Sequence, residues 1–290
     1  MGGLRSLARR FAVRLARSIA PTEVETALRF AESRSFAAFP KRNVQTVSEV
    51  PVGRVLILSP HPDDEAIGMG GTLRKHLDNG SDVTVLYLTD GGGLEEPREK
   101  MRAVRRAEAE ALGAATGARQ VFWTNEDTRL TNDAATVDEM VALLRELRPE
   151  HIYTPSIFDH HYDHFSTNQI LVDALDRLDD CDASVSGYEV WDDIPFPNWV
   201  VDISAEAEAK DALLGFYPTP LSYTDFVQLC RSRTSVHFAL YVTSERSRAA
   251  RGFAEAFLRF DPRTYSELQH AWVRALRADG NDLADHLQTH

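Results

Sequence analysis

The architecture is indicated most clearly by the segment Val55-Leu56-Ile57-Leu58-Ser59-Pro60-His61-Pro62-Asp63-Asp64-Glu65. It opens with a short, continuous apolar run, which is typical of a strand that is buried on both of its faces. The residues that follow, 65–79, have the pattern of a helix that ends at Gly80. A buried strand that leads directly into a helix indicates a βα unit of a parallel sheet.

The same alternation continues on the carboxyl side of this unit. Strands and helices that alternate in this way favour right-handed crossovers and a mostly parallel sheet with helices on both faces. We therefore predict an α/β fold with a Rossmann-like, doubly wound sheet and a smaller mixed C-terminal part. The further predicted elements are the strands 82–89, 120–124 and 151–155 and the helices 98–116, 136–148 and about 166–178.

The C-terminal part of the chain has a mixed pattern. Strands are predicted at 188–191 and 199–203, and helices at 205–216 and 246–259. The predicted division of the chain is an N-terminal extension with a basic amphipathic helix (1–50), a Rossmann-like core that carries the site (51–195) and a C-terminal α/β part that completes the same domain (196–290).

Composition argues against some classes of partner. The 290 residues are 43% hydrophobic and 26% charged, which is the ordinary mixture of a globular protein that buries a core. The formal net charge of −12 argues against a nucleic-acid partner, since phosphate binding requires clustered Lys and Arg. The two cysteines, Cys181 and Cys230, have no paired spacing, which favours a reducing compartment and a cytoplasmic location.

Residues 4–19 have an apolar stripe at helical spacing, with arginines elsewhere on the surface of the same helix. In one interpretation this helix lies at the inner face of a membrane, attracted to anionic lipid. In the other interpretation it docks on the protein's own core or is a disordered leader. The first interpretation is the basis for predicting peripheral membrane contact through residues 4–19.

Two polar clusters follow predicted strands. The first is His61-Pro62-Asp63-Asp64-Glu65, and the second is Asp159-His160-His161-Tyr162-Asp163-His164. His61 and Asp64 are three residues apart, as are His161 and His164, so each pair points the same way on a helical turn. If the two strands are neighbours in the sheet, both clusters lie at the switch point where open α/β sheets bind ligands.

These residue types fit a metal site. Two imidazoles and one carboxylate, with a water in the fourth position, form the ligand set of hydrolytic zinc sites. Taken singly, the first cluster also fits acids that the positive end of a helix dipole favours, and the second fits a solvated turn. Because both clusters follow strands of the same α/β pattern, a metal site is the better explanation of the pair.

The segment 56–73, which contains His61-Pro62-Asp63-Asp64-Glu65, resembles the signature of the PIG-L/LmbE family of zinc-dependent N-deacetylases. In that family a His-Pro-Asp-Asp-Glu motif follows the first strand. The second family motif, two histidines three apart with Asp before the last one, is matched by His161-Tyr162-Asp163-His164, with Tyr where the family often has Pro. The resemblance covers roughly residues 51–260.

By position, the resemblance implies that His61, Asp64 and His164 bind Zn²⁺, although Fe²⁺ or another divalent metal would suit the same ligands. It also implies that Asp63 is the general base that takes a proton from the attacking water. The adjacent acids therefore have different implied roles, one as base and the other as ligand.

The resemblance further assigns residues around the metal. His161 would stabilise the oxyanion or protonate the leaving amine. Asp163 would hold the ring of His161, support a ligand histidine or merely cap the loop. Arg105 and Asp127 are candidates for binding sugar hydroxyls, with an ordinary solvated position as the alternative. His237 is an outlying candidate, for which a core or edge position is the stronger expectation.

The implied function is metal-dependent removal of an N-acetyl group from an N-acetylglucosamine-type sugar in a small-molecule glycoconjugate. One alternative is an amidase of the same family that cleaves a larger acyl group, as in thiol-conjugate hydrolysis. The other is a catalytically silent carbohydrate-binding module on the same fold, against which the intact set of polar residues argues. The sequence leaves the sugar, its aglycone and the oligomeric state undetermined.

Overall fold

The chain divides into two compact units, one formed by Lys41–Ser266 and the other by Met1–Pro40 with Glu267–His290. The sheet and the predicted site residues lie in the first unit. The helix predicted over 4–19 lies outside the described residues. The computed structural model describes residues 44–93, 97–178, 180–242 and 251–277.

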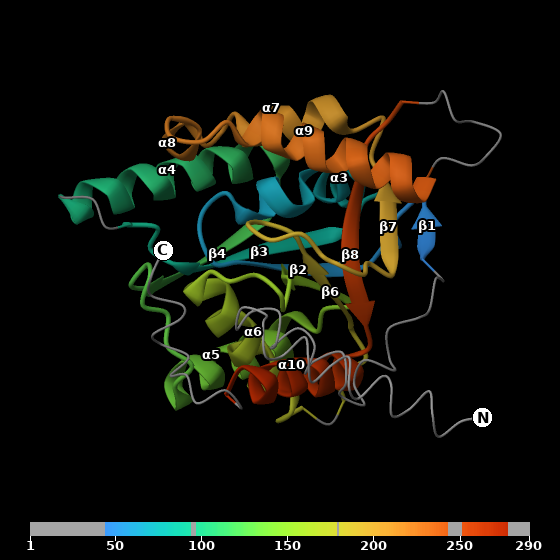
Figure 1. The fold of residues 1–290 in the computed structure, drawn as a ribbon. Helices are drawn as coiled ribbons and strands as arrows, with labels where there is room; N and C mark the ends of the chain where they lie inside the picture. The colour runs from blue at the N-terminus through green and yellow to red at the C-terminus, as the bar shows by residue number, and fades with distance from the viewer. Residues whose placement is uncertain (1–43, 94–96, 179, 243–250, 278–290) are drawn as a thin grey trace, which may run out of the picture. The chain divides into compact units, whose positions relative to one another are not determined.

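An eight-stranded sheet forms the centre of the described chain, in the order β1-β7-β8-β6-β5-β2-β3-β4 (Figure 1). All neighbouring strands are parallel except β8, which runs antiparallel to both β6 and β7. The predicted fold class, a mostly parallel doubly wound sheet, is confirmed. The strands are β1 (Gln45–Val47), β2 (Arg54–Ser59), β3 (Asp82–Thr89), β4 (Arg119–Asn125), β5 (His151–Pro155), β6 (Ser184–Tyr188), β7 (Trp199–Asp202) and β8 (Ala254–Phe260).

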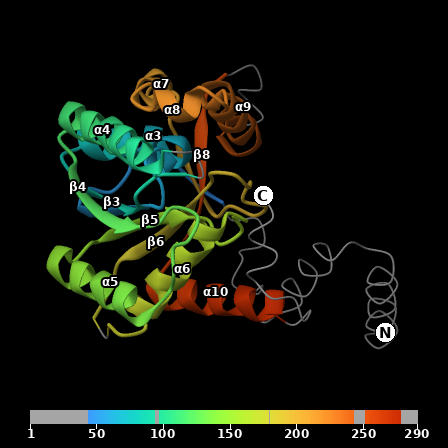
Figure 2. The same cartoon turned by 90° about the vertical axis from the view of Figure 1, so that its left-hand side faces the viewer.

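Helices cover both faces of this sheet. Figures 1 and 2 show α3, α4, α7 and α9 on one face and α5 and α6 on the other. Among the described residues, no helix combines the length and the apolar character that crossing a bilayer requires. The helices are α3 (Asp64–Asp78), α4 (Arg98–Thr116), α5 (Ala134–Leu147), α6 (Tyr162–Leu175), α7 (Ala207–Leu214), α8 (Pro218–Leu221), α9 (Phe226–His237) with a π-helical turn, η2 (Phe238–Val242), and α10 (Pro262–Arg277).

The two strands that precede the polar clusters are neighbours. β2 pairs in parallel with β5, with Ile57 opposite Tyr153, and with β3 on its other side. The chain thus builds the sheet outward in both directions from the β2–β5 boundary, which is the switch point expected from the sequence. The adjacency on which the predicted site depends is therefore confirmed.

The apolar run that forms β2 is buried as expected. Leu56, Ile57 and Leu58 are fully buried, because helices cover both faces of β2. Close helix–strand approach also explains the glycines of α3: a Cβ at Gly68 would overlap the ring of Tyr188 in β6. Only glycine therefore allows α3 to lie this close to the sheet.

Helix α3 is broken at Met69, whose φ of −144° and ψ of 25° are not helical. The Nζ of Lys210 donates to the carbonyl of Ile67 before the break at 2.7 Å. The carboxylate of Glu255 accepts from two backbone N–H groups after the break, at 2.9 and 2.7 Å. Lys210 and Glu255 lie 2.6 Å apart and are both buried. This ion pair supplies hydrogen-bond partners for backbone groups that lose their helical hydrogen bonds at the break.

The helix predicted over 246–259 is wrong. Residues Ala254–Phe260 form β8, which lies between β6 and β7 inside the sheet, while 243–250 lie outside the described residues. Ala254, Ala256, Phe257 and Leu258 are all buried, so the apolar positions do not alternate as in a half-exposed strand. A short apolar run of this kind cannot be distinguished from a helix by its periodicity.

Candidate active site

Three predicted metal ligands meet at the carboxyl ends of β2 and β5. The Oδ2 of Asp64 lies 3.2 Å from the Nδ1 of His61 and 3.2 Å from the Nε2 of His164. The two nitrogens are 3.4 Å apart. Tetrahedral zinc with bonds of about 2.0–2.1 Å requires ligand atoms about 3.3–3.4 Å apart. The three donor atoms therefore have the spacing of three corners of a zinc tetrahedron.

The local fold explains why these side chains converge. Ser59, the last residue of β2, donates to the carbonyl of His61 at 2.7 Å, and the amide of His61 donates to Asp64 at 2.8 Å. Asp64 is the first residue of α3, and His164 lies in the first turn of α6, which begins at Tyr162, four residues earlier than expected. Two helix starts thus face each other across the β2–β5 boundary.

The donor atoms of His61, Asp64 and His164 form a triangle, and each of its two histidines has a carboxylate at its other ring nitrogen. The Nε2 of His61 lies 2.9 Å from Asp163 and 3.3 Å from Asp127. The Nδ1 of His164 lies 3.1 Å from Asp159, a residue of the second polar cluster to which the sequence pattern assigns no role. Such partners fix the ring orientation of metal-binding histidines and raise their basicity.

The electrostatics of the triangle favour a cation. Burial alone lowers the pKa of His164, but the carboxylates of Asp64 and Asp159 outweigh it and raise the pKa to about 10. The same competition between burial and the carboxylates of Asp127 and Asp64 raises the pKa of His61 well above its usual value. The negative groups therefore dominate, and a divalent ion would supply the positive charge that they stabilise.

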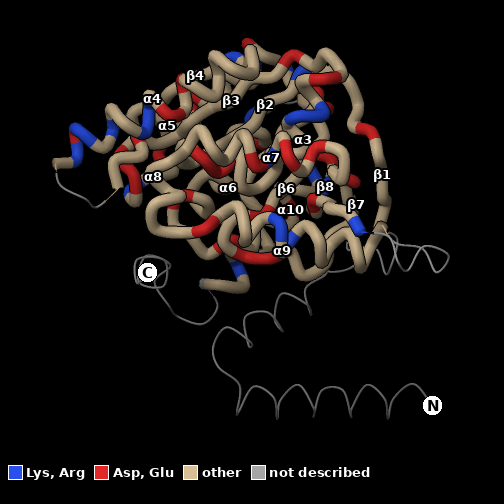
Figure 3. The backbone as a smooth tube through the Cα atoms, turned by 90° about the horizontal axis from the view of Figure 1, so that it is seen from above, with Lys and Arg blue, Asp and Glu red and all other residues tan. Residues whose placement is uncertain are grey.

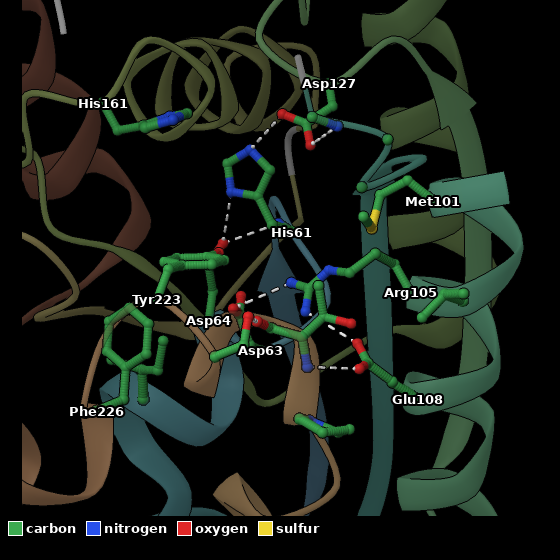
Figure 4. Close-up of a pocket in the computed structure, with 18 of the residues that line it drawn as sticks. His61, Asp63, Asp64, Met101, Arg105, Glu108, Asp127, His161, Tyr223 and Phe226 are labelled. Carbon is green, nitrogen blue, oxygen red and sulfur yellow. Dashed lines mark hydrogen bonds and ion pairs between the residues drawn. The ribbon is translucent and has the colours of Figure 1, made fainter. Parts of the chain in front are cut away.

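Asp63 is held in an unusual conformation beside the triangle. Its φ of 134° lies in the region that favours glycine, and it precedes the first residue of α3. Arg105 lies 3.0 Å from its Oδ2, donates to the carbonyl of Pro62 and pairs with Glu108 at 3.0 Å. Burial raises the pKa of Asp63, while Arg105 opposes the shift. Figure 4 shows Arg105 between the two carboxylates.

Glu65 lies beneath Asp63 and is fully buried. The hydroxyl of Ser59 lies 2.8 Å from its carboxylate, and Tyr87 donates to it at 3.2 Å. The hydroxyl of Tyr217 donates to the same carboxylate oxygen as Tyr87. Burial raises the pKa of Glu65. Its contacts are with the protein, so its role is to support the turn that carries Asp63.

A cavity of about 660 Å³ opens beside these residues. Six of the predicted site residues line it, and Figure 4 shows the ring of His61 between Asp127 and Asp64, with His161 across from them. The other two predicted residues, Asp163 and His164, are fully buried behind this lining. The six lining residues are His61, Asp63, Asp64, Arg105, Asp127 and His161.

The contacts of Asp163 fit two of the roles considered for it, support of a ligand histidine and capping of a loop. Its carboxylate contacts His61 and accepts from the amides of Thr128 and Leu130, at 2.7 and 3.0 Å, and its own amide donates to the Nδ1 of His161 at 3.2 Å. The side chain therefore contacts both His61 and the loop at 128–130, while the backbone N–H contacts the ring of His161.

His237 lies outside the site. Its Nε2 is 2.7 Å from Glu189, and both residues are buried at the junction of α9 with the loop after β6. This contact matches the core position that the sequence favoured.

Comparisons with known proteins agree with this geometry. Residues 56–175 match the family described as PIG-L, GlcNAc-PI de-N-acetylase. A diacetylchitobiose deacetylase from Thermococcus kodakarensis is 32% identical over 179 residues, which cover 55% of this chain and 67% of that enzyme. The chain belongs to the PIG-L family. A second relative, a 1D-myo-inositol 2-acetamido-2-deoxy-alpha-D-glucopyranoside deacetylase from Mycobacterium sp. (strain JLS), is 25% identical, and the match covers 70% of this chain and 88% of the relative.

Solved structures show how widely this PIG-L fold is used. N,N'-diacetylchitobiose deacetylase from Pyrococcus horikoshii superposes with a TM-score of 0.59 at 21% identity, covering 85% of this chain and 96% of that one. GalB, the 4-carboxy-2-hydroxymuconate hydratase from Pseudomonas putida KT2440, superposes with a TM-score of 0.60 at 19% identity. The match covers 72% of this chain and 96% of that one. Since a hydratase shares the fold, the reaction must be argued from the site.

Proposed function

We propose that this protein is a metal-dependent deacetylase that hydrolyses the acetamide of an N-acetylglucosamine-type sugar within a small glycoconjugate, releasing acetate and a free amine. The observation that carries the proposal is the triangle of His61, Asp64 and His164, with edges of 3.2–3.4 Å, beside the carboxylate of Asp63. Relatives named as deacetylases of N-acetylated sugars support the same reaction.

We assign Zn²⁺ to the triangle, with Fe²⁺ or another divalent ion as the alternative occupant. Its two nitrogens and one carboxylate oxygen are the donor set of hydrolytic zinc, and the spacing fits a tetrahedron. When bound, the metal would lower the pKa of a water from 15.7 toward about 7 and polarise the acetamide carbonyl.

The chain's own residues then perform the proton transfers. Asp63, held by Arg105 at the edge of the triangle, takes a proton from the attacking water, whose oxygen adds to the carbonyl carbon. His161 lines the opposite side of the cavity, where its ring stabilises the oxyanion or delivers a proton to the departing nitrogen. The C–N bond breaks, the acetyl carbon keeps the water oxygen, and the sugar nitrogen leaves as an amine.

The sugar-binding roles of Arg105 and Asp127 remain part of this proposal. Both line the cavity, but their polar contacts are with Asp63 and Glu108 in one case and with His61 and the amide of Gly93 in the other. We therefore expect each to position a reacting group first and to meet sugar hydroxyls through its remaining exposed atoms.

We infer a cytoplasmic location from the cysteines. Cys181 and Cys230 are both free thiols, which suits a cytoplasmic enzyme. Peripheral membrane contact through residues 4–19 stays a prediction.

The decisive experiment measures acetate release from a panel of N-acetylated sugars. Metal-loaded wild type should release acetate, and Asp63→Asn should lose about a hundredfold or more of kcat while it keeps its metal. Asp138→Asn is the matched control, because that carboxylate is 73% exposed and does not line the cavity, and it should keep full activity.

The other outcomes separate the alternatives. Release of longer acids but not of acetate would favour an amidase that cleaves a larger acyl group. Sugar binding without hydrolysis of any amide would favour a silent carbohydrate-binding module.

A further inference from the structure

The cavity has a polar floor and an apolar wall. The floor is made by His61, Asp64, Asp63, Arg105 and Asp127, whereas the wall consists of large side chains from three separate parts of the chain. Trp191 is 41% exposed, Tyr223 66% and Val104 38%, which places all three among the exposed large hydrophobic residues of the described chain. The members of this apolar wall are Met101, Val104, Trp191, Tyr223 and Phe226.

Figure 4 shows part of this wall around the polar residues. Tyr223 and Phe226 lie on the side of Asp64, and Met101 lies on the side of Arg105. The ring of Trp191 contacts Phe226 edge-on, with centroids 5.7 Å apart. A single exposed apolar side chain is common on protein surfaces and needs no explanation. Several exposed apolar side chains that line the same polar cavity, by contrast, indicate a binding surface.

The apolar wall is held in position by the site itself. The amide of Trp191 donates at 2.9 Å to Asp159, the carboxylate that also contacts His164. On the other side, Glu108, which pairs with Arg105, accepts from the amide of Thr219 at 2.8 Å and so anchors α8 just before Tyr223. Because the backbone that carries Trp191, and the short helix before Tyr223, are anchored in this way, ligand binding need order only their side chains.

The charges around the cavity determine which kind of group the apolar wall accepts. Asp63, Asp64, Glu108 and Asp127 line the cavity, and among the described residues of its lining Arg105 is the one Lys or Arg. That guanidinium is already paired with two of the carboxylates. With a divalent cation in the triangle, the four carboxylates (−4) still exceed the metal and Arg105 together (+3), and a phosphate or carboxylate on the ligand finds no unpaired cationic side chain among the described lining residues. Figure 3 shows acidic positions interspersed with basic ones along α4 and over α3 and α7.

We propose that the apolar wall binds a neutral, apolar aglycone of the amino-sugar substrate. The inference rests on the proposed function, in which acetate is the small group released and the rest of the substrate must occupy the cavity. The sugar lies over the polar floor, and its aglycone packs against Trp191 and Tyr223. The wall thus selects alkyl or aryl glycosides of N-acetylglucosamine over the sugar phosphate.

The test compares three substrates: methyl, octyl and 1-phosphate N-acetylglucosaminides. Wild type should hydrolyse the octyl glycoside with a kcat/KM about tenfold above that of the methyl glycoside, mainly through KM, because burial of a few methylene groups corresponds to about this factor. The 1-phosphate should be no better than the methyl glycoside. Trp191→Ala and Tyr223→Ala should each reduce the octyl-to-methyl ratio toward unity.

Leu240→Ala is the matched control, since Leu240 is 65% exposed but does not line the cavity. It should leave the octyl-to-methyl ratio unchanged. A ratio near unity in wild type, or a ratio that survives both aromatic substitutions, would overturn the proposal. So would a preference for longer N-acyl groups at a constant methyl aglycone, because the wall would then hold the acyl side.

Calorimetric binding of octyl and methyl glucosaminide, the deacetylated products, separates this inference from the proposed function. Tighter binding of the octyl compound that depends on Trp191, in a protein that hydrolyses nothing, would support the apolar wall and contradict the reaction. Hydrolysis with equal binding of both products would support the reaction and contradict the wall.

Discussion

The guanidinium of Arg105 lies 3.0 Å from the Oδ2 of Asp63 and also donates to the carbonyl of Pro62. One side chain on α4 therefore holds both the carboxylate and the preceding backbone of a residue whose φ is 134°. Strain of this kind persists only where surrounding contacts overdetermine the conformation. The proposed general base thus depends on a residue 42 positions away in the sequence for its geometry.

Replacement of Arg105 by Ala should damage stability and catalysis together. The change leaves Asp63 and Glu108 as buried carboxylates without their partner. Loss of one partner of a buried pair lowers the free energy of unfolding by about 3–5 kcal/mol. We expect this loss in urea unfolding, with a fall in kcat measured on the same preparation. Arg106→Ala is the neighbouring control, because its pair with Glu110 is about half exposed, and it should cost less than about 1 kcal/mol. Equal losses in the two variants would contradict the role given to Arg105.

Lys210→Met should destabilise the broken helix α3. It removes the partner of Glu255, a charge that is 1% exposed, and the donor to the carbonyl of Ile67. The expected loss is about 3 kcal/mol or more in urea unfolding. Arg119→Met, which breaks a pair with Glu146 that is more than half exposed, should cost less than about 1 kcal/mol. If Lys210→Met also lowered the free energy of unfolding by less than about 1 kcal/mol, the ion pair would not be what maintains the break.

Asp163→Asn should weaken metal binding. Its carboxylate lies 2.9 Å from the Nε2 of His61, and loss of such a partner typically lowers metal affinity about 10–100-fold. Competition with a chromophoric chelator measures the change, with Asp138→Asn as a control that keeps the wild-type affinity. Unchanged affinity together with a lower kcat would instead indicate that Asp163 acts through His161.

His76 should make the protein less stable as the pH falls. Burial, with smaller effects from His151 and Arg259, lowers the pKa of His76 to about 3, while the unfolded chain titrates near about 6.5. Below that pH the unfolded state binds a proton that the folded state does not, so stability is lost by up to about 1.4 kcal/mol per pH unit until the pH reaches about 3.

Urea unfolding of wild type and His76→Gln between these two pH values measures this contribution. In His76→Gln the free energy of unfolding should fall less steeply with decreasing pH than in wild type, whatever the effect of the substitution at neutral pH. Identical slopes for the two proteins would exclude His76 as its source.

The central architecture could be predicted because its signals are local. The buried run of β2, the helix that ends before Gly80 and the long helix α4 are all encoded by neighbouring residues, and α4 was predicted with the bounds it has. The position of His61 and Asp64 follows from the same segment. Their convergence with His164 depended on the pairing of β2 with β5, which the alternating pattern favours.

Other features could not be predicted because they depend on distant residues. The break in α3 is satisfied by Lys210 and Glu255, which lie well over a hundred positions away in the chain. The contact of the Asp163 carboxylate with His61, while only its backbone amide contacts the ring of His161, depends on residues that are distant in the sequence. Strand β8 was mistaken for a helix because burial on both faces removes the alternation that identifies a strand.

The central claim is tested most directly by measuring bound metal and acetate release in the same samples. Chelator-treated wild type and Asp64→Ala would be titrated with Zn²⁺ and assayed on an N-acetylated glycoside. We predict that wild-type activity rises with bound metal to a plateau at stoichiometric loading, and that Asp64→Ala neither retains the metal nor releases acetate. Full acetate release by the chelated wild type, or stoichiometric loading of Asp64→Ala, would contradict the account.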